Sequence, residues 1–167
     1  MSNHKISSEL RAQVAVAVQR MQAASDTMDE AAASVLRINR TDFRACSVLA
    51  YSGPMSASAL AEATGLSRGA MTTSLDRLEK AGYVRRTAAE ADRRSIIVEL
   101  TKKTLRIAAT IWGPLAVESN GRLEHVSKED LQTIVHFLEG STRLLESHAE
   151  RVRGMAKRRV ARKAVAP

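Results

Sequence analysis

The sequence predicts a mainly α-helical protein in which a helix-turn-helix and a small β-hairpin lie between two helical regions. Three observations support this fold class. Apolar residues recur at helical spacing over long stretches on both sides of the centre of the chain. In the centre, Gly65 and Gly82 end short helical patterns. Two short β-prone stretches follow Gly82, separated by a polar segment.

The N-terminal region predicts one long amphipathic helix over residues 8–35, with Ser7 or Ser8 as its cap. One face of this helix is apolar and carries Leu10, Val14, Val18, Met21, Met28, Ala32 and Val35. Such a stripe indicates a packing face, and a chain of 167 residues offers little surface of its own to cover it. We therefore expect this helix to pack against a second copy of the chain.

Two short helices are expected next. Residues 39–42 form a break in which Thr41 is the expected cap of a helix over residues 43–52, and Gly53-Pro54 ends that helix. Ser56 can cap a helix over residues 57–64. Gly65 then supplies the left-handed backbone of a tight turn, where a small residue at Ala61 lets the following helix approach.

The helix that follows this turn has the composition of a DNA recognition helix. It is expected to begin at its cap Ser67 and to run to Ala81, with Met71, Leu75 and Leu78 inward. Its outward face carries Arg68, Gly69, Ala70, Thr72, Thr73, Asp76 and Arg77. Small residues allow close approach to a groove, hydroxyls and arginines bind bases or phosphates, and the helix N-terminus favours phosphate. The alternative is an ordinary solvated helix face.

A β-hairpin after this helix would act as a wing. Residues 83–86 and 95–100 have strand character, and residues 87–94 form the expected loop. Arg93 and Arg94 near its tip suit a narrow minor groove, or are simply a solvated pair. Asp92 can pair with Arg77 and so fix the wing against the recognition helix.

Residues 36–104 resemble the winged helix-turn-helix of the MarR family of bacterial transcriptional regulators. The resemblance depends on an ordered set of short segments, namely residues 53–56, 60–61, 65–67, 75–84, Asp92 with Arg94 and Ser95, and Val98 with Leu100 and Thr101. It implies a homodimer joined through the terminal helices, which binds a palindromic operator in double-stranded DNA. It also implies a repressor more often than an activator, usually released by a small molecule or an oxidant.

The resemblance also implies roles for single residues. Arg77 and Asp92 would form the wing brace, Arg94 would contact the minor groove, and Tyr51 and Trp112 would line an effector pocket or simply pack. Many relatives carry longer side chains at the positions of Thr73 and Ala70, so base readout here is expected to be lighter and to depend more on DNA shape. Ser74 is polar where an apolar residue is usual.

The C-terminal part predicts two more helices and a basic tail. Thr101 can cap a helix from Lys102, with an interruption and kink at residues 112–114 because Pro114 lacks an amide hydrogen. Ser127 can cap the last helix, whose apolar stripe is Leu131, Ile134, Val135, Leu138, Leu144 and Leu145. Residues 1–38 and 102–150 would thus form the helical dimerisation region and residues 39–101 the winged helix-turn-helix. The tail, residues 151–167, is a disordered solvated segment, an arm that contacts phosphates, or an extension of the last helix.

Composition excludes several other classes of protein. The net charge of +8 comes largely from the tail, which has seven basic and no acidic residues, whereas residues 67–103 carry nine basic and five acidic ones. Cys46, the single cysteine, falls on an expected buried face and is not expected to sense oxidants. The histidines lack metal-ligand spacing, and no catalytic motif, signal peptide or membrane-spanning run is present. We expect a cytoplasmic protein that is not an enzyme and needs no metal or cofactor.

The sequence therefore predicts a dimeric, sequence-specific DNA-binding regulator. Two alternatives remain. One is a basic architectural protein that binds all duplexes alike, and the other is a winged-helix module that binds proteins and no longer binds DNA. Salt dependence and sequence preference distinguish the first alternative from a regulator.

Overall fold

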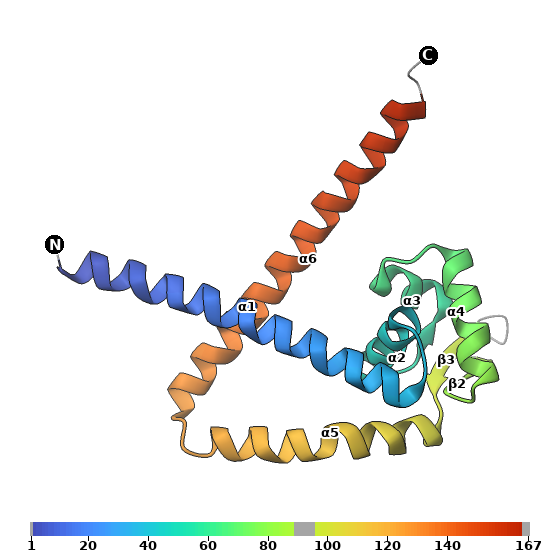
Figure 1. Ribbon diagram of the computed structural model, residues 1–167, viewed down its shortest axis with the longest axis horizontal. Coiled ribbons are helices and arrows are strands. Elements are labelled where there is room, and N and C mark those ends of the chain that lie inside the picture. The colour runs from blue at the N-terminus through green and yellow to red at the C-terminus, as the bar shows by residue number, and fades with distance from the viewer. Residues whose placement is uncertain (1, 89–95, 165–167) are drawn as a thin grey trace. The chain divides into compact units, whose positions relative to one another are not determined.

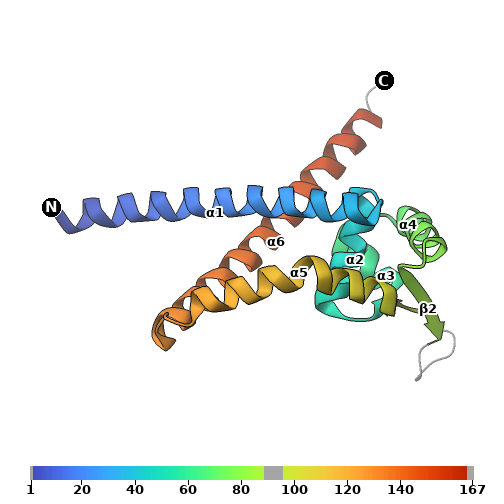
Figure 2. The same cartoon turned by 60° about the horizontal axis from the view of Figure 1, so that its bottom comes forward.

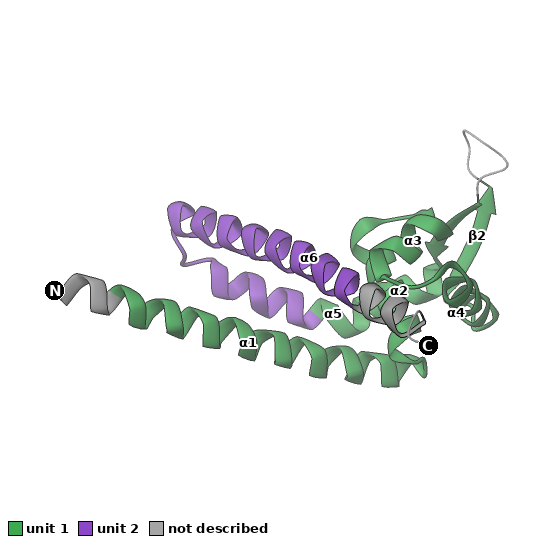
Figure 3. Ribbon diagram, turned by 90° about the horizontal axis from the view of Figure 1, so that it is seen from above, with its two compact units in different colours: residues 1–113 green, residues 114–167 purple. Residues whose placement is uncertain are grey.

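The computed structural model describes residues 2–88 and 96–164, and the side chains of residues 7–88 and 96–155. The elements in chain order (Figure 1) are α1 (Ser2–Leu36), α2 (Arg40–Ser52), β1 (Met55–Ser56), α3 (Ala57–Thr64), α4 (Arg68–Lys80), β2 (Val84–Ala88), β3 (Ile96–Leu100), α5 (Lys102–Leu123) and α6 (Lys128–Ala164). This confirms the predicted fold class, which is mainly helical with a small antiparallel sheet. The chain divides into two compact units, residues 1–113 and 114–167 (Figure 3).

Side-chain caps set where the short helices begin. The Ser56 hydroxyl accepts a hydrogen bond from the Ala59 amide, and the Ser67 hydroxyl accepts one from the Ala70 amide, each at 3.2 Å, which confirms both predicted caps. The cap predicted at Thr41 is wrong. The side chain of Asn39 accepts from the Asp42 amide at 2.9 Å, so α2 begins at Arg40.

The turn between α3 and α4 follows the sequence prediction. Gly65 adopts a φ of +73°, which a residue with a Cβ atom rarely adopts. Its amide bonds back to the carbonyl of Glu62, and the Leu66 amide bonds to that of Ala61. Ala61 is buried, consistent with a close approach of the two helices.

The sheet has the order β1-β3-β2 and is antiparallel throughout. Strands β2 and β3 pair from Val84 opposite Leu100 to Ala88 opposite Ile96, which confirms the predicted hairpin. Strand β1 was not predicted, because two residues are too few to show alternation. The predicted loop began at Thr87, but Thr87 and Ala88 pair with β3 and belong to β2, because the ladder extends two residues beyond the predicted strand. Residues 89–95, which contain the rest of the predicted loop, lie outside the described residues.

The core of the first unit lies between α2, α3, α4 and the sheet. Its fully buried side chains include Leu60, Met71, Leu75, Leu78, Val84 and Val98. A second cluster joins the end of α1 to α2 through Ala32, Ala33, Leu36 and Phe43, with Trp112 of α5 packed against it. This core places α4 firmly in the domain with one face outward.

The long helices extend further than the sequence predicted. Helix α1 begins at Ser2 instead of residue 8, and α5 runs through Pro114 without the predicted interruption. Proline removes only one amide donor, and the helix continues on either side of it. Helix α6, capped by Ser127, reaches Ala164, so residues 151–164 extend the last helix, as one of the three alternatives for the tail proposed. Among the described residues, no helix is both long and apolar enough to cross a membrane.

Candidate nucleic-acid interface

The exposed face of α4 brings together most of the predicted DNA-binding residues. Met71, Leu75 and Leu78 are buried, and the opposite face carries the exposed residues Ser67, Arg68, Gly69, Ala70, Thr72, Thr73 and Arg77. A Cβ atom at Gly69 would meet no atom within 4 Å, so this part of the helix presents open backbone to a ligand. The arrangement suits close approach to a large polar partner.

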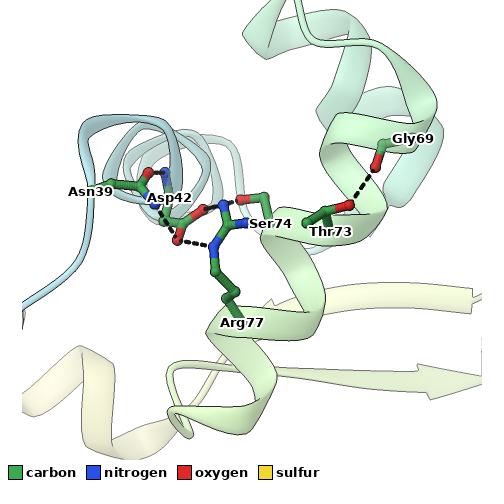
Figure 4. Close-up of polar contacts among 6 residues, drawn as sticks. All are labelled: Asn39, Asp42, Gly69, Thr73, Ser74 and Arg77. Carbon is green, nitrogen blue, oxygen red and sulfur yellow. Dashed lines mark hydrogen bonds and ion pairs between the residues drawn. The ribbon is translucent and has the colours of Figure 1, made fainter.

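The two threonines of this face are held in defined orientations. The Thr72 hydroxyl donates to the carbonyl of Arg68 at 3.0 Å. The Thr73 hydroxyl donates to that of Gly69 at 3.1 Å, as Figure 4 shows. Because each proton is used within the helix, each oxygen remains available as an acceptor. The exocyclic amino groups of adenine and cytosine are major-groove donors that such oxygens can bind.

A polar network fixes α4 to α2 (Figure 4). The Asp42 carboxylate accepts hydrogen bonds from Nε and Nη2 of Arg77 at 2.9 and 2.7 Å. It also accepts one from the Ser74 hydroxyl at 2.5 Å and one from Nδ2 of Asn39 at 2.9 Å. Only 4% of the Asp42 side chain is exposed, against 49% of the Arg77 side chain. The carboxylate is therefore satisfied inside the domain, while Arg77 still reaches solvent.

The network shifts the titration of its charged members. Burial alone would raise the pKa of Asp42, but hydrogen bonds from Arg77, Ser74 and Asn39 stabilise the carboxylate and bring its pKa below the ordinary value. The hydrogen bond to Asp42 in turn raises the pKa of Arg77. Asp42 thus stays ionised at neutral pH although it is buried.

A second set of ion pairs joins the hairpin to α4. Arg86 of β2 binds Asp76 through Nη2 at 2.7 Å and Glu79 through Nη1 at 2.5 Å. The hydrogen bond to Asp76 is the main reason that the pKa of Arg86 is raised, and Glu79 adds to it. Figure 2 shows β2 beside α4, and these pairs tie the two together. Arg85 instead pairs with Glu99 within the hairpin, at 2.9 Å.

Sequence reasoning missed both sets of contacts. It proposed Asp92 as the partner of Arg77, whereas the structure shows Asp42 in contact with Arg77. Asp92, Arg93 and Arg94 lie outside the described residues, so their proposed roles in the wing remain predictions. One signal was present, since Ser74 is a polar residue at an inward-facing position of α4, and such a residue needs a partner.

The two residues named for an effector pocket differ in environment. Trp112 is half-buried against the cluster of Ala32, Ala33, Leu36 and Phe43. Tyr51 is 76% exposed near the end of α2. Their role in binding a small molecule remains a prediction.

Comparison with known proteins identifies the domain that carries this site. Residues 38–96, which include α2, α3, α4 and β2 and end at the first residue of β3, match the MarR family. The winged helix-turn-helix of this chain belongs to the MarR family. This is a family of DNA-binding transcriptional regulators, and α4 lies within the matched residues.

Two curated proteins and a solved structure are similar to longer parts of the chain. The uncharacterized HTH-type transcriptional regulator YcgE of Bacillus subtilis (strain 168) is 29% identical over 153 residues, which are 92% of this chain and 99% of YcgE. YfiV, from the same strain and with the same description, is 36% identical over 95 residues, or 57% of this chain and 59% of YfiV. The crystal structure of NadR in complex with 4-hydroxyphenylacetate shares the fold, with a TM-score of 0.56 and 22% identity over 75% of this chain and 89% of NadR.

Proposed function

We propose that this MarR-family protein is a homodimeric repressor that binds a palindromic operator and is released by a small-molecule effector. The observation that carries the proposal is the exposed face of α4, where small and hydroxyl-bearing residues project from a helix fixed on its other side. The core and the Asp42 network hold that helix, and Arg86 joins it to the hairpin. A helix held so firmly is suited to enter a major groove at a set angle.

Dimerisation is supported by apolar surface that the described part of one chain leaves exposed. Helix α1 exposes Leu10, Val14 and Met21, and α6 exposes a longer series, namely Ile134, Val135, Phe137, Leu138, Leu144, Leu145, Val152 and Met155. Apolar surface of this extent on a monomer marks an interaction site. A two-fold dimer would present two α4 helices, which a palindromic operator matches.

Release by an effector is supported by the comparison with NadR, whose structure contains 4-hydroxyphenylacetate. We propose to measure effector binding by the fluorescence of the half-buried Trp112, because a ligand that changes the surroundings of this side chain changes its emission. Quenching by a compound that also releases bound DNA supports this part of the proposal. If no compound among the tested metabolites of the source organism releases the bound DNA, this result counts against an effector.

Selection of fragments from the source genome tests the DNA-binding part. We expect purified protein to enrich a few palindromic fragments at physiological salt, with a preference over bulk DNA on the order of 10³-fold or more. Equal binding to all duplexes with a steep salt dependence would instead indicate the architectural alternative.

The matched pair Thr73→Ala and Thr110→Ala tests the role of α4. Both threonines are exposed and bond to the carbonyl four residues back, but Thr110 lies on α5. We expect Thr73→Ala to weaken binding to the selected fragment about 3- to 10-fold, which is the loss of one hydrogen bond, and Thr110→Ala to leave it unchanged. Equal affinities of both variants and the unaltered protein would show that Thr73 does not contact the DNA, whereas a failure to enrich any fragment or to bind bulk DNA would favour the protein-interaction module.

A further inference from the structure

The Asp42 carboxylate contacts α4 at two positions, one turn apart. Ser74 and Arg77 are three residues apart and lie on the same side of the helix, and both donate to the carboxylate. A single contact would let the helix pivot, whereas two contacts along its axis restrict both its rotation and its tilt. Asn39, which caps α2, holds the carboxylate from the other side at 2.9 Å.

The contact with Arg77 uses only one edge of its guanidinium. Nε and Nη2 bind Asp42, and the side chain remains 49% exposed. An arginine held by this fork keeps one rotamer, so its remaining N–H groups point in a fixed direction. These groups lie on the same helix as the exposed residues Gly69 and Thr73 (Figure 4).

We propose that Asp42 is a positioning residue for DNA binding, which holds Arg77 in place to bind a backbone phosphate while α4 occupies the groove. This inference rests on the proposed function. Asp42 itself is buried and touches no DNA. It acts through Arg77, whose contact with a phosphate fixes the register of the helix on the duplex.

The charge of Asp42 makes the proposal easy to distinguish from a general electrostatic effect. Replacing Asp42 by asparagine makes the protein one unit more positive, and simple attraction to DNA would then increase affinity. If Arg77 is instead no longer held in place to bind a phosphate, the affinity for DNA would decrease. The two accounts therefore predict opposite signs for the same substitution.

The experiment measures affinity over a range of salt concentrations for the full chain and four variants. The probes are the fragment selected by the unaltered protein and an unrelated duplex of equal length. The variants are Asp42→Asn, Arg77→Gln, the double variant, and Glu62→Gln as control. Glu62 is an exposed acid on α3, so the control makes the same change of charge outside the network. Circular dichroism at the assay temperature verifies that each variant is folded.

We expect Asp42→Asn and Arg77→Gln each to weaken binding to the selected fragment about 10-fold. Each should also lower the slope of log affinity against log salt by about 0.9, which corresponds to one lost phosphate contact. The double variant should behave like Arg77→Gln alone, because Asp42 acts only through Arg77. Glu62→Gln should bind as tightly as the unaltered protein or more tightly.

Arg77→Lys provides a second route if Asp42→Asn does not fold. Lysine keeps the charge but cannot form the fork with Asp42, so we expect the same loss of slope as for Arg77→Gln. An Asp42→Asn or Arg77→Lys protein that is folded and keeps the affinity and slope of the unaltered protein overturns the inference alone. Failure of the unaltered protein to prefer any fragment overturns the proposed function and the inference with it.

Discussion

At the residue scale, Asp42 gives the domain a pH dependence of stability. Its pKa is lowered in the folded protein, so folding favours the ionised carboxylate. The stabilisation is complete above the pKa of this aspartate in the unfolded chain, about 4. It is lost as pH falls through the lower pKa that the carboxyl has in the folded protein. We expect Asp42→Asn to reduce the free energy of unfolding by about 1 to 3 kcal/mol at pH 7. The difference should shrink below about pH 4. Urea denaturation between pH 3 and 7 measures it, and a difference that stays constant over this range would contradict the assignment.

Cys46 is the second residue for which the environment leads to a prediction, here of the reactivity of its thiol. Burial first, and the nearby Asp42 charge second, raise the pKa of this thiol to about 12. At pH 8 its thiolate fraction is therefore lower than that of an ordinary cysteine by a factor on the order of 10³. We expect a chromogenic disulfide reagent to react with the native protein that much more slowly than with protein in denaturant. Rapid reaction of the native protein, or release of DNA by peroxide, would show that Cys46 is accessible and can act as a sensor.

The contacts of Asp42 could not be predicted from the sequence because they join residues that are far apart along the chain. Ser74 could be recognised as polar at an inward position, yet its partner lies 32 residues away on another helix. The contact of Arg77 with Asp42 depends on how α2 packs against α4, which no local pattern contains. By contrast, the burial of Cys46 follows from helical periodicity alone and was predicted.

At the scale of elements, local chemistry fixed most boundaries. The caps at Ser56 and Ser67 and the left-handed turn at Gly65 are decided by neighbouring residues, so the sequence predicted them. The predicted start of α2 was wrong because Asn39 and Thr41 are both good caps. The structure uses Asn39, whose side chain also donates a hydrogen bond to the Asp42 carboxylate. The path of α5 through Pro114 was wrong because a proline weakens a helix without always ending it.

At this scale we predict how the hairpin is held, because the ion pairs of Arg86 connect it to α4. We expect Arg86→Gln to increase hydrogen exchange at the amides of β2 and β3. Since such partly exposed ion pairs are weak, it should cost only about 0.5 to 1 kcal/mol of stability. Arg85→Gln is the matched control, since it removes the same charge from β2 while its ion pair, with Glu99, lies inside the hairpin. Equal exchange in the two variants would show that the pairs with Asp76 and Glu79 do not hold the wing.

At the scale of the whole molecule, the apolar faces of α1 and α6 explain why the sequence predicted an interaction between copies. Helical periodicity showed that these faces exist, and the structure shows that many of their residues stay exposed in the described part of one chain. Periodicity does not contain the geometry of a dimer, since side chains from two chains must interlock. The dimer therefore stays a proposal with a direct test.

Charges placed in the apolar face of α6 should separate the two copies. Leu138 and Leu145 are large exposed apolar residues two turns apart, so Leu138→Asp with Leu145→Asp places two carboxylates on that face. We expect sedimentation velocity to show a dimer for the unaltered protein at micromolar concentration and a monomer for this variant. Its affinity for a palindromic fragment should fall by about 10²-fold or more, because the two half-sites are no longer bound by linked domains. Gln132→Glu, which adds one charge at an exposed polar position of α6, should remain a dimer. A dimer that survives both aspartates would place the interface elsewhere, whereas a folded monomer that still binds the palindrome with full affinity would remove the need for two copies.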